Sequence, residues 1–326
     1  MLLHGPNGAG KTNLLEALHV GTQGFSPRAR RDTQMIRFGS AAGRVALEGS
    51  LGEGAFETDV VLASREPRRV SLNGEHLGSS ERLRHELTTL VFTPDRLAVV
   101  KGAPATRRAY LDRAVSRLFP ARATLGNDYA AAVGQRNAGL RRVRLGQSTR
   151  DALGPWSERV VALGSELVEA RTEAVGLLSS RFAGIAAALG LAGAALSYEG
   201  DSPTQEDLDA RLETDVERGT TSAGPHLHDL RIEASGRDLR AYGSQGEQRI
   251  AVLALVLAEA DALRDRVGRT PLVLLDDVLS ELDEGRRRSL AELLALDAQT
   301  VVTTTSAAAF PDEPAQSLAV TPGEVR

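Results

Sequence analysis

The loop at residues 5–12, which reads GPNGAGKT, constrains the fold more than any other feature of the chain. It matches the phosphate-binding pattern G-x-x-x-x-G-K-[ST], which lies between a strand and the N-terminus of a helix. Here the loop follows the apolar residues 1–3 and precedes a helical pattern that places Leu14, Leu15 and Leu18 on one face. Backbone N–H groups of such a loop and the positive end of the helix dipole hold phosphate oxygens. The sequence therefore predicts a nucleoside triphosphate site.

Two side chains of this loop have distinct predicted roles. Lys11 is expected to neutralise the β and γ phosphates of ATP, and the Thr12 hydroxyl is expected to bind Mg²⁺. Lys11 and Lys101 are the only lysines among 39 basic residues, which suggests that lysine is kept where a compact ammonium is needed. The predicted nucleotide-binding residues of the loop are Gly5, Pro6, Asn7, Gly8, Ala9, Gly10, Lys11 and Thr12.

Two acids follow a continuous apolar segment late in the chain, where Leu272–Leu275 precedes Asp276 and Asp277. This is the form of a Walker B strand, in which the first carboxylate holds hydrated Mg²⁺. Asp276 takes that role, and Asp277 is placed to orient or deprotonate the attacking water. A structural alternative is that the two acids merely begin a turn. The predicted catalytic residues are Lys11, Asp276 and Asp277, and the predicted metal ligands are Thr12 and Asp276. The phosphate loop and this strand are expected to lie side by side, because both would serve one nucleotide.

A second anion-binding segment is predicted at residues 242–249 (YGSQGEQR), which resembles the signature of ATP-binding-cassette proteins. In that resemblance Ser244, Gln245 and Gly246 bind the γ-phosphate of a nucleotide held by another protomer. The site would then be complete only in an ATP-dependent homodimer. Ser244 and Glu247 also have the spacing of a capping box, which needs no ligand. Both interpretations can hold at once, because a serine-led helix N-terminus is itself an anion site.

The remaining pattern divides the chain into two expected lobes. Residues 41–100 alternate in hydrophobicity between turn signals, as in an antiparallel sheet, and helical spacing then runs from about residue 106 to 189. Strand patterns return at 230–233 and 301–304, a buried helix is predicted at 244–263, and the tail beyond Pro311 is expected to be frayed. We predict an α/β P-loop ATPase head with mixed sheets. Its ATPase lobe comprises residues 1–100 and 225–326, and a mostly helical lobe of residues 101–224 is inserted.

Composition and charge narrow the environment and the partners. The chain has no cysteine, and its apolar stretches are too short to span a bilayer, which fits a cytoplasmic protein without a membrane partner. Between Lys101 and Arg150 there are eleven basic residues against two acids, although the overall charge is −4. Such a block is a candidate footprint for a polyanion such as DNA, and the alternative is a solvated helical face. The predicted DNA-contacting residues are Arg107, Arg108, Arg141, Arg142 and Arg144.

Several longer segments resemble the RecF family, a bacterial recombination mediator ATPase family related to the structural-maintenance-of-chromosomes proteins. The segments are 94–102 (PDRLAVVKG) with 107–112 (RRAYLD), 274–277 with 280–283 (SELD), 135–137 (QRN) and 224–226 (GPH). The chain departs from the family's pattern in three places. The family has strands ahead of the phosphate loop, so the first sheet is expected to be incomplete here. Leu227-His228-Asp229 replaces the family's Arg-Asp-Asp, and residues 303–305 (TTT) occupy the region where transporters have a switch histidine.

The resemblance implies an ATP-gated clamp on duplex and gapped DNA that acts with the RecR and RecO proteins to help RecA load. Hydrolysis is expected to be slow, because Asp277 is shorter than the glutamate of many related ATPases and because the site needs a second copy. Two alternatives remain open at this point. One is the nucleotide-binding subunit of an ATP-binding-cassette transporter, and the other is a non-catalytic scaffold that binds ATP only to dimerise.

Overall fold

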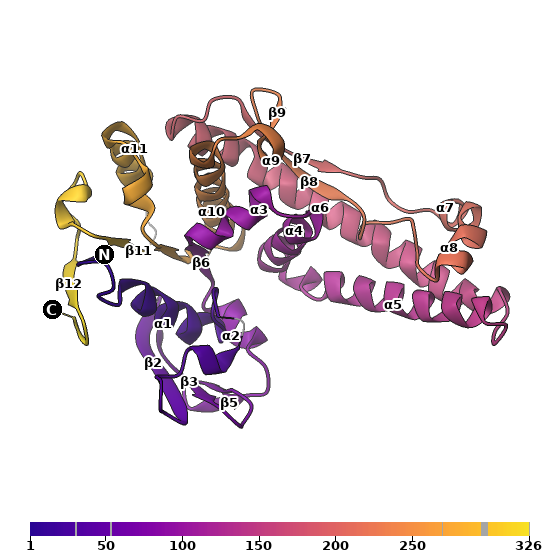
Figure 1. Ribbon diagram of the computed structural model, residues 1–326, viewed down its shortest axis with the longest axis horizontal. Coiled ribbons are helices and arrows are strands. Elements are labelled where there is room, and N and C mark those ends of the chain that lie inside the picture. Colours follow the sequence, from indigo (N-terminus) through magenta and orange to yellow (C-terminus); the bar gives the residue numbers. More distant parts are fainter. Residues whose placement is uncertain (30, 53, 269, 295–298, 326) are drawn as a thin grey trace. The chain divides into compact units, whose positions relative to one another are not determined.

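The computed structural model describes residues 1–29, 31–52, 54–268, 270–294 and 299–325 (Figure 1). The chain divides into two compact units, the first made of Met1–Arg96, Ala188–Gly190 and Leu263–Arg326, and the second of Leu97–Ala187 and Leu191–Ala262. This division differs from the predicted lobes mainly because residues 225–262 fall in the second unit. The predicted lobe boundaries stay a prediction about folding domains.

The first unit contains a six-stranded sheet in the order β13-β12-β1-β11-β10-β6. All neighbouring strands are parallel except the terminal pair β12 and β13. The strands are β1 (Leu2–His4), β6 (Thr89–Phe92), β10 (Leu272–Leu275), β11 (Thr300–Thr304), β12 (Ser317–Thr321) and β13 (Glu324–Val325). Leu274 and Leu275 are fully buried, as expected for a central parallel strand that is covered on both faces. The predicted α/β fold with a mixed sheet is confirmed.

Two expectations about this sheet were wrong. The tail beyond Pro311 is not frayed throughout, because β12 pairs in parallel with β1, with Leu318 beside Leu3. Two residues, Leu318 and Val320, pack with Leu3 in the apolar core of the sheet. In addition, β6 belongs to the parallel sheet rather than to the antiparallel sheet predicted over 41–100. Its residues Thr89–Phe92 are all buried, so no alternation of exposure marks them in the sequence.

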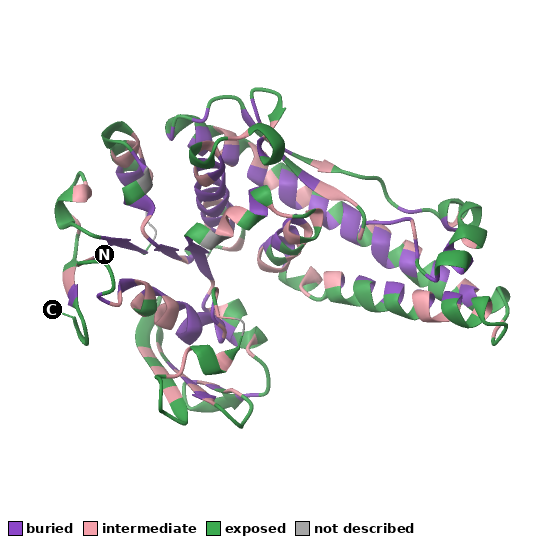
Figure 2. Ribbon diagram, in the orientation of Figure 1, coloured by how far each residue is buried: buried purple, intermediate pink, exposed green. Residues whose placement is uncertain are grey.

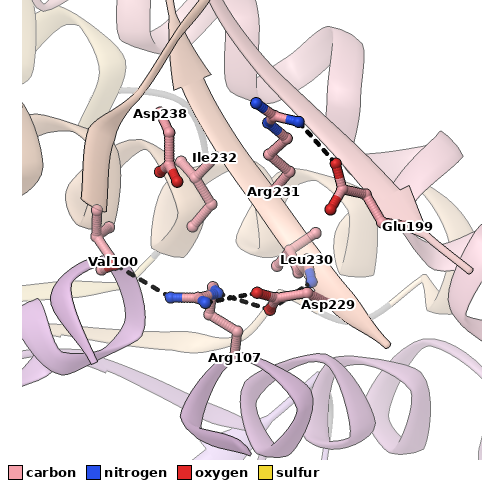
Figure 3. A pocket seen from close by; sticks show the side chains of 8 residues that line it. All are labelled: Val100, Arg107, Glu199, Asp229, Leu230, Arg231, Ile232 and Asp238. Carbon is pink, nitrogen blue, oxygen red and sulfur yellow. Dashed lines mark hydrogen bonds and ion pairs between the residues drawn. The ribbon is translucent and has the colours of Figure 1, made fainter. Parts of the chain in front are cut away.

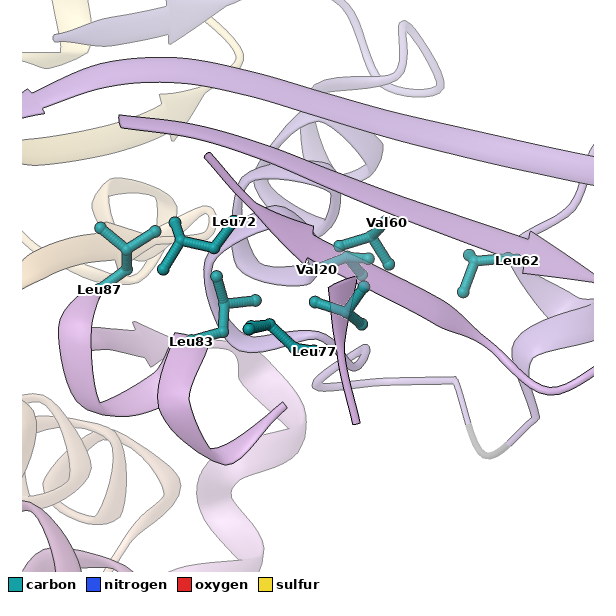
Figure 4. Close-up of a cluster of buried hydrophobic side chains, with 8 residues drawn as sticks. Val20, Val60, Leu62, Leu72, Leu77, Leu83 and Leu87 are labelled. Carbon is teal, nitrogen blue, oxygen red and sulfur yellow. The ribbon is translucent and has the colours of Figure 1, made fainter. Parts of the chain in front are cut away.

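A four-stranded antiparallel sheet forms the other layer of the first unit, in the order β2 (Ala42–Leu51), β3 (Gly54–Ala63), β4 (Arg69–Leu72) and β5 (Glu75–Leu77). Helix α1 (Lys11–Gln23) contacts β2 and β3 as well as β6 and β11, so it lies between the two sheets. Figure 4 shows Val20 of α1 and Leu83 of α2 (Glu81–Glu86) among inward side chains of the antiparallel sheet. This unit also contains α11 (Glu284–Leu294) and the short helices η1 (Asp32–Gln34), η5 (Val278–Glu281) and η6 (Ala307–Ala309).

The second unit is mostly helical and is built on the long helices α5 (Leu125–Arg144) and α6 (Gly154–Ala188). Each presents a buried stripe to its neighbours and an exposed outer face (Figure 2). The same unit contains a three-stranded antiparallel sheet of β7 (Ala194–Glu199), β8 (Asp229–Ala234) and β9 (Arg237–Asp238). The other helices are α3 (Ala98–Lys101), α4 (Pro104–Leu118), η3 (Pro120–Arg122), η4 (Asp151–Leu153), α7 (Gln205–Ala210), α8 (Leu212–Arg218) and α9 (Leu239–Tyr242).

Two segments run across the division between the units. They are η2 (Pro94–Leu97) and the predicted buried helix α10, which extends over Gln245–Val267. Within the described ranges, no helix combines the length and the apolarity that crossing a bilayer requires.

Candidate nucleotide-binding site

The phosphate loop has the local structure that its sequence predicts. It connects β1 to α1, and Gly10 caps the helix in the left-handed region with φ of 105°, which a residue with a Cβ atom rarely adopts. The Lys11 side chain is buried, and its Nζ donates hydrogen bonds to the carbonyl oxygens of Gly5 (2.7 Å) and Pro6 (3.0 Å). The ammonium group therefore lies inside the curve of the loop, where a phosphate oxygen could replace these two acceptors.

Gly5 is required for a different reason, which is the close approach of the neighbouring strand. A Cβ atom added at Gly5 would lie 2.1 Å from the carbonyl oxygen of Val320 in β12. That oxygen belongs to the backbone and cannot rotate away as a side chain could. The loop can therefore begin where it does only because its first residue has no side chain.

The Walker B carboxylate is held by two hydroxyl groups. Asp276 directly follows β10, and its Oδ1 accepts hydrogen bonds from Thr12 Oγ1 (3.0 Å) and from Thr303 Oγ1 (2.8 Å). The expectation that the phosphate loop and the end of this strand lie side by side is confirmed, because Thr12 of the loop donates to Asp276. The strand that precedes the loop is not the direct neighbour of β10. Strand β11 lies between β1 and β10, and Val302 is paired with both Leu2 and Leu275. Near the end of β11, the side chain of Thr303 therefore lies next to Asp276, which follows β10.

Asp277 leaves the strand in an unusual conformation. Its φ of 51° and ψ of 32° place it in the left-handed region, and its backbone N–H donates to Thr303 Oγ1 over 2.8 Å. The Oδ1 atom of its carboxylate is buried and has no hydrogen-bond partner among the described residues. Buried polar atoms are rarely left unpaired, and those that are often mark a place for a water molecule or a ligand.

The residues present fit Mg²⁺ bound together with phosphates. Mg²⁺ prefers oxygen ligands and takes few of them from protein, since it retains waters and phosphate oxygens. The Thr12 hydroxyl directs its single proton to Asp276, so its lone pairs stay available to a cation. Thr303 is a part of this site that sequence reasoning missed. The sequence signal for it is the run of threonines at 303–305, at the end of an apolar segment.

The signature segment has the structure of its capping-box alternative. Ser244 precedes α10, its backbone N–H donates to Glu247 Oε2 (2.7 Å), and its Oγ accepts the Glu247 N–H (3.2 Å). Hydrogen bonding of the Glu247 carboxylate to Ser244, chiefly to its backbone N–H, lowers the pKa of that carboxyl. Ser244, Gln245 and Gly246 are exposed at this helix terminus, in the second unit. Their role toward a nucleotide of another protomer stays a prediction.

Arg107, one of the predicted DNA contacts, is committed to the protein interior. Its side chain is 4% exposed, and Nε and NH2 donate to the two carboxylate oxygens of Asp229 over 2.7 and 2.6 Å. A third nitrogen donates to the carbonyl oxygens of Val100 (3.3 Å) and Gly102 (2.9 Å). Arg107 and Asp229 are among the residues that line a cavity of about 210 Å³ in the second unit (Figure 3). Because the guanidinium is buried and already paired with Asp229, this structure does not support a DNA contact at Arg107.

The other four predicted DNA contacts differ in exposure. Arg108 is half-buried and donates to the carbonyl oxygen of His228 over 2.8 Å, and burial lowers its pKa. Arg141, Arg142 and Arg144 lie exposed in the last turn of α5. This last set retains the accessibility that a phosphate contact needs.

Most of the remaining basic block is neutralised by acids from elsewhere in the chain. Arg117 pairs with Glu259 over 2.6 Å, Arg150 pairs with Glu213, and the fully buried Arg136 pairs with Asp215 over 2.7 Å. The eleven basic residues and two acids between Lys101 and Arg150 give a net charge of +9 (11 − 2). Because of these ion pairs, that sum does not describe the charge of a surface.

The family-like segments 135–137 and 224–226 are linked through Thr221 in the second unit, because the Thr221 N–H donates to Asn137 Oδ1 over 2.7 Å. Arg171 donates to the carbonyl oxygen of Pro225 (2.7 Å) and pairs with Asp112. The imidazole of His226 contacts the Tyr129 hydroxyl through Nδ1 (2.7 Å) and the Thr221 carbonyl oxygen through Nε2 (3.0 Å). Burial lowers the pKa of His226, so its neutral form is favoured. These segments hold helices and loops together, which explains their sequence by structure alone.

The fold and the site define a P-loop ATPase head of the type shared with structural-maintenance-of-chromosomes proteins. The family model "RecF/RecN/SMC N terminal domain" matches residues 1–322. The head domain of Smc from Pyrococcus furiosus is similar in fold, with a TM-score of 0.58 at 18% identity over 100% of this chain and 88% of that one.

Within that class, the chain belongs to the RecF family. It is 40% identical over 324 residues to the DNA replication and repair protein RecF of Anaeromyxobacter dehalogenans, covering 93% of this chain and 86% of that protein. The identity to RecF of Heliobacterium modesticaldum is 34%, with 95% and 87% covered. A solved structure described as the recombination mediator protein RecF with ATP, in the RecFOR pathway, superposes with a TM-score of 0.84 at 26% identity, over 100% of this chain and 90% of that chain. The transporter alternative is not favoured by these matches.

Proposed function

We propose that this chain is an ATP-dependent DNA-binding recombination mediator that dimerises around its nucleotides. It would bind duplex and gapped DNA and act with RecO and RecR to promote RecA loading at single-strand gaps. The observation that carries the proposal is the convergence of Thr12, Asp276 and Thr303 beside the phosphate loop in a chain of the RecF family. The partners are those expected from the family.

The chain's own residues supply the groups that ATP hydrolysis needs. Lys11 would exchange its two loop carbonyls for oxygens of the β and γ phosphates, and the Thr12 hydroxyl and Asp276 would hold Mg²⁺. Bound Mg²⁺-ATP supplies the electrophilic phosphorus and the metal charge. Asp277, with one buried carboxylate oxygen unpaired, would accept a hydrogen bond from the attacking water and orient it.

Two features support slow hydrolysis that depends on a second copy. The aspartate side chain at 277 is one methylene shorter than the glutamate of many related ATPases, so it reaches less far toward the water. Ser244, Gln245 and Gly246 stand exposed at the N-terminus of a long helix, where they could bind the γ-phosphate held by a second copy. Closure of two copies around two nucleotides would then complete each site.

The test is the binding of a labelled gapped duplex, followed by fluorescence anisotropy with ATP, with ADP and without nucleotide. We expect ATP to increase the affinity and ADP to fail to do so. Lys11→Ala should abolish the effect of ATP, whereas Lys101→Ala, a change at the only other lysine, which is exposed, should retain it. Equal affinity with ATP, ADP and no nucleotide would reject the proposal.

A further inference from the structure

The hydroxyl of Thr303 joins the two acidic residues of the candidate site. Thr303 is fully buried near the end of β11, its Oγ1 accepts the backbone N–H of Asp277, and it donates to Asp276 Oδ1, each over 2.8 Å. A hydroxyl has a single proton, and an N–H group can only donate. The proton of Thr303 must therefore point to the Asp276 carboxylate, and the direction of both hydrogen bonds is fixed.

These two hydrogen bonds act on both acids together. The carboxylate of Asp276 is fixed between Thr303 and Thr12, which come from two different elements. The N–H bond holds the backbone of Asp277 in the left-handed region, which is unfavourable for a residue with a Cβ atom unless its surroundings stabilise it. One side chain thus sets where two consecutive carboxylates point.

We infer that Thr303 is a positioning residue of the nucleotide site, which orients Asp276 for Mg²⁺ and Asp277 for the attacking water. The inference rests on the proposed function and goes beyond it, because Thr303 need not touch the nucleotide. Loss of the hydroxyl frees the Asp276 carboxylate to rotate and removes the acceptor of the Asp277 N–H. Binding through the phosphate loop itself, which depends on Lys11, should be unaffected.

The experiment compares Thr303→Val, which keeps the shape and removes the hydroxyl, with Thr303→Ser, which keeps the hydroxyl. Thr304→Val is the matched control, because Thr304 is equally buried on the same strand and donates to the Ser306 carbonyl oxygen instead. Binding of a fluorescent non-hydrolysable ATP analogue is titrated with Mg²⁺ and also measured in EDTA. Turnover gives kcat and KM separately.

For Thr303→Val we expect the half-saturating Mg²⁺ concentration to rise about tenfold and kcat to fall at least about tenfold, in line with the loss of a hydrogen bond to a charged group. Binding in EDTA and KM at saturating Mg²⁺ should stay near wild type. Thr303→Ser and Thr304→Val should behave as wild type. Should Thr303→Val fail to fold, Thr303→Cys carries the test, since a thiol is a weak donor and acceptor.

The inference is overturned if Thr303→Val keeps the wild-type Mg²⁺ dependence and turnover, or if Thr304→Val shows the same losses. It is also overturned if Thr303→Val weakens binding in EDTA as much as in Mg²⁺, because Thr303 would then shape the whole pocket. A wild-type chain that binds no nucleotide would instead defeat the proposed function, and the inference with it.

Discussion

Replacement of Arg107 tests whether this residue of the basic block stabilises the fold or contacts DNA. Arg107→Met keeps the length of the side chain and removes the guanidinium with its bidentate pair to Asp229. Breaking a fully buried ion pair costs about 3 to 5 kcal/mol, because the remaining charge stays buried without its partner. The Asp229 side chain is 25% exposed and can regain water. We therefore expect the lower end of that range, a loss of about 3 kcal/mol in the free energy of unfolding.

Urea unfolding followed by tryptophan fluorescence measures this loss directly. The only tryptophan, Trp156, lies on α6 in the same unit as Arg107, so its signal reports on that unit. The comparison is the triple replacement of Arg141, Arg142 and Arg144 by Gln, which should leave the unfolding midpoint unchanged because these side chains are exposed.

DNA binding should respond in the opposite way. If the three arginines of α5 each contact a phosphate, the triple variant lowers the slope of log K against log salt by about 2 to 3, since each lost contact removes about 0.9. Arg107→Met should leave that slope unchanged. The reasoning is refuted if Arg107→Met unfolds at the wild-type urea concentration while its salt slope falls by about 1.

Three further predictions address the catalytic base, the loop and two half-buried histidines. Asp277→Asn should lower ATP turnover by on the order of 10² to 10⁴ and slow DNA release while nucleotide binding persists; an unchanged release rate would favour the non-catalytic scaffold. Gly5→Ala should destabilise the sheet by on the order of 3 kcal/mol and abolish nucleotide binding, because its Cβ would lie 2.1 Å from the Val320 carbonyl oxygen; a wild-type melting temperature with intact binding would contradict this. Burial lowers the pKa of His226 and His228 in the folded state below the ordinary 6.5, so the unfolded chain binds more protons. The free energy of unfolding should therefore fall as the pH drops below about 6.5. Urea unfolding at a series of pH values measures this change, and a rise in stability on acidification would refute the prediction.

Sequence patterns predicted the parts of the site that are contiguous in the chain. The phosphate loop, the strand before Asp276 and the helix after Ser244 each carry their signal within a few residues, because local backbone geometry dictates those residue types. The two roles of Ser244 could not be separated in this way. The capping box is visible in one chain, whereas the proposed phosphate binding would require a second copy.

The rest depended on pairings between distant segments. Thr303 could not be identified, because its role depends on the position of β11 between β1 and β10. The order of strands in a sheet cannot be derived from the residues of a single strand. Summing charges over Lys101 to Arg150 failed for a related reason, since Asp229, Asp215 and Glu259 neutralise that block from far along the chain. The strand β12 was missed because its residues lie between prolines and its partners are the short strands β1 and β13.

The most direct measurement of the account is the molar mass of the chain by light scattering under saturation with a non-hydrolysable ATP analogue. The account predicts that the mass doubles from 34.6 kDa with the analogue and Mg²⁺, remains single with ADP, and remains single for Lys11→Ala. A chain that binds the analogue fully and still scatters as a monomer would contradict the claim that each copy holds only half of its ATP site.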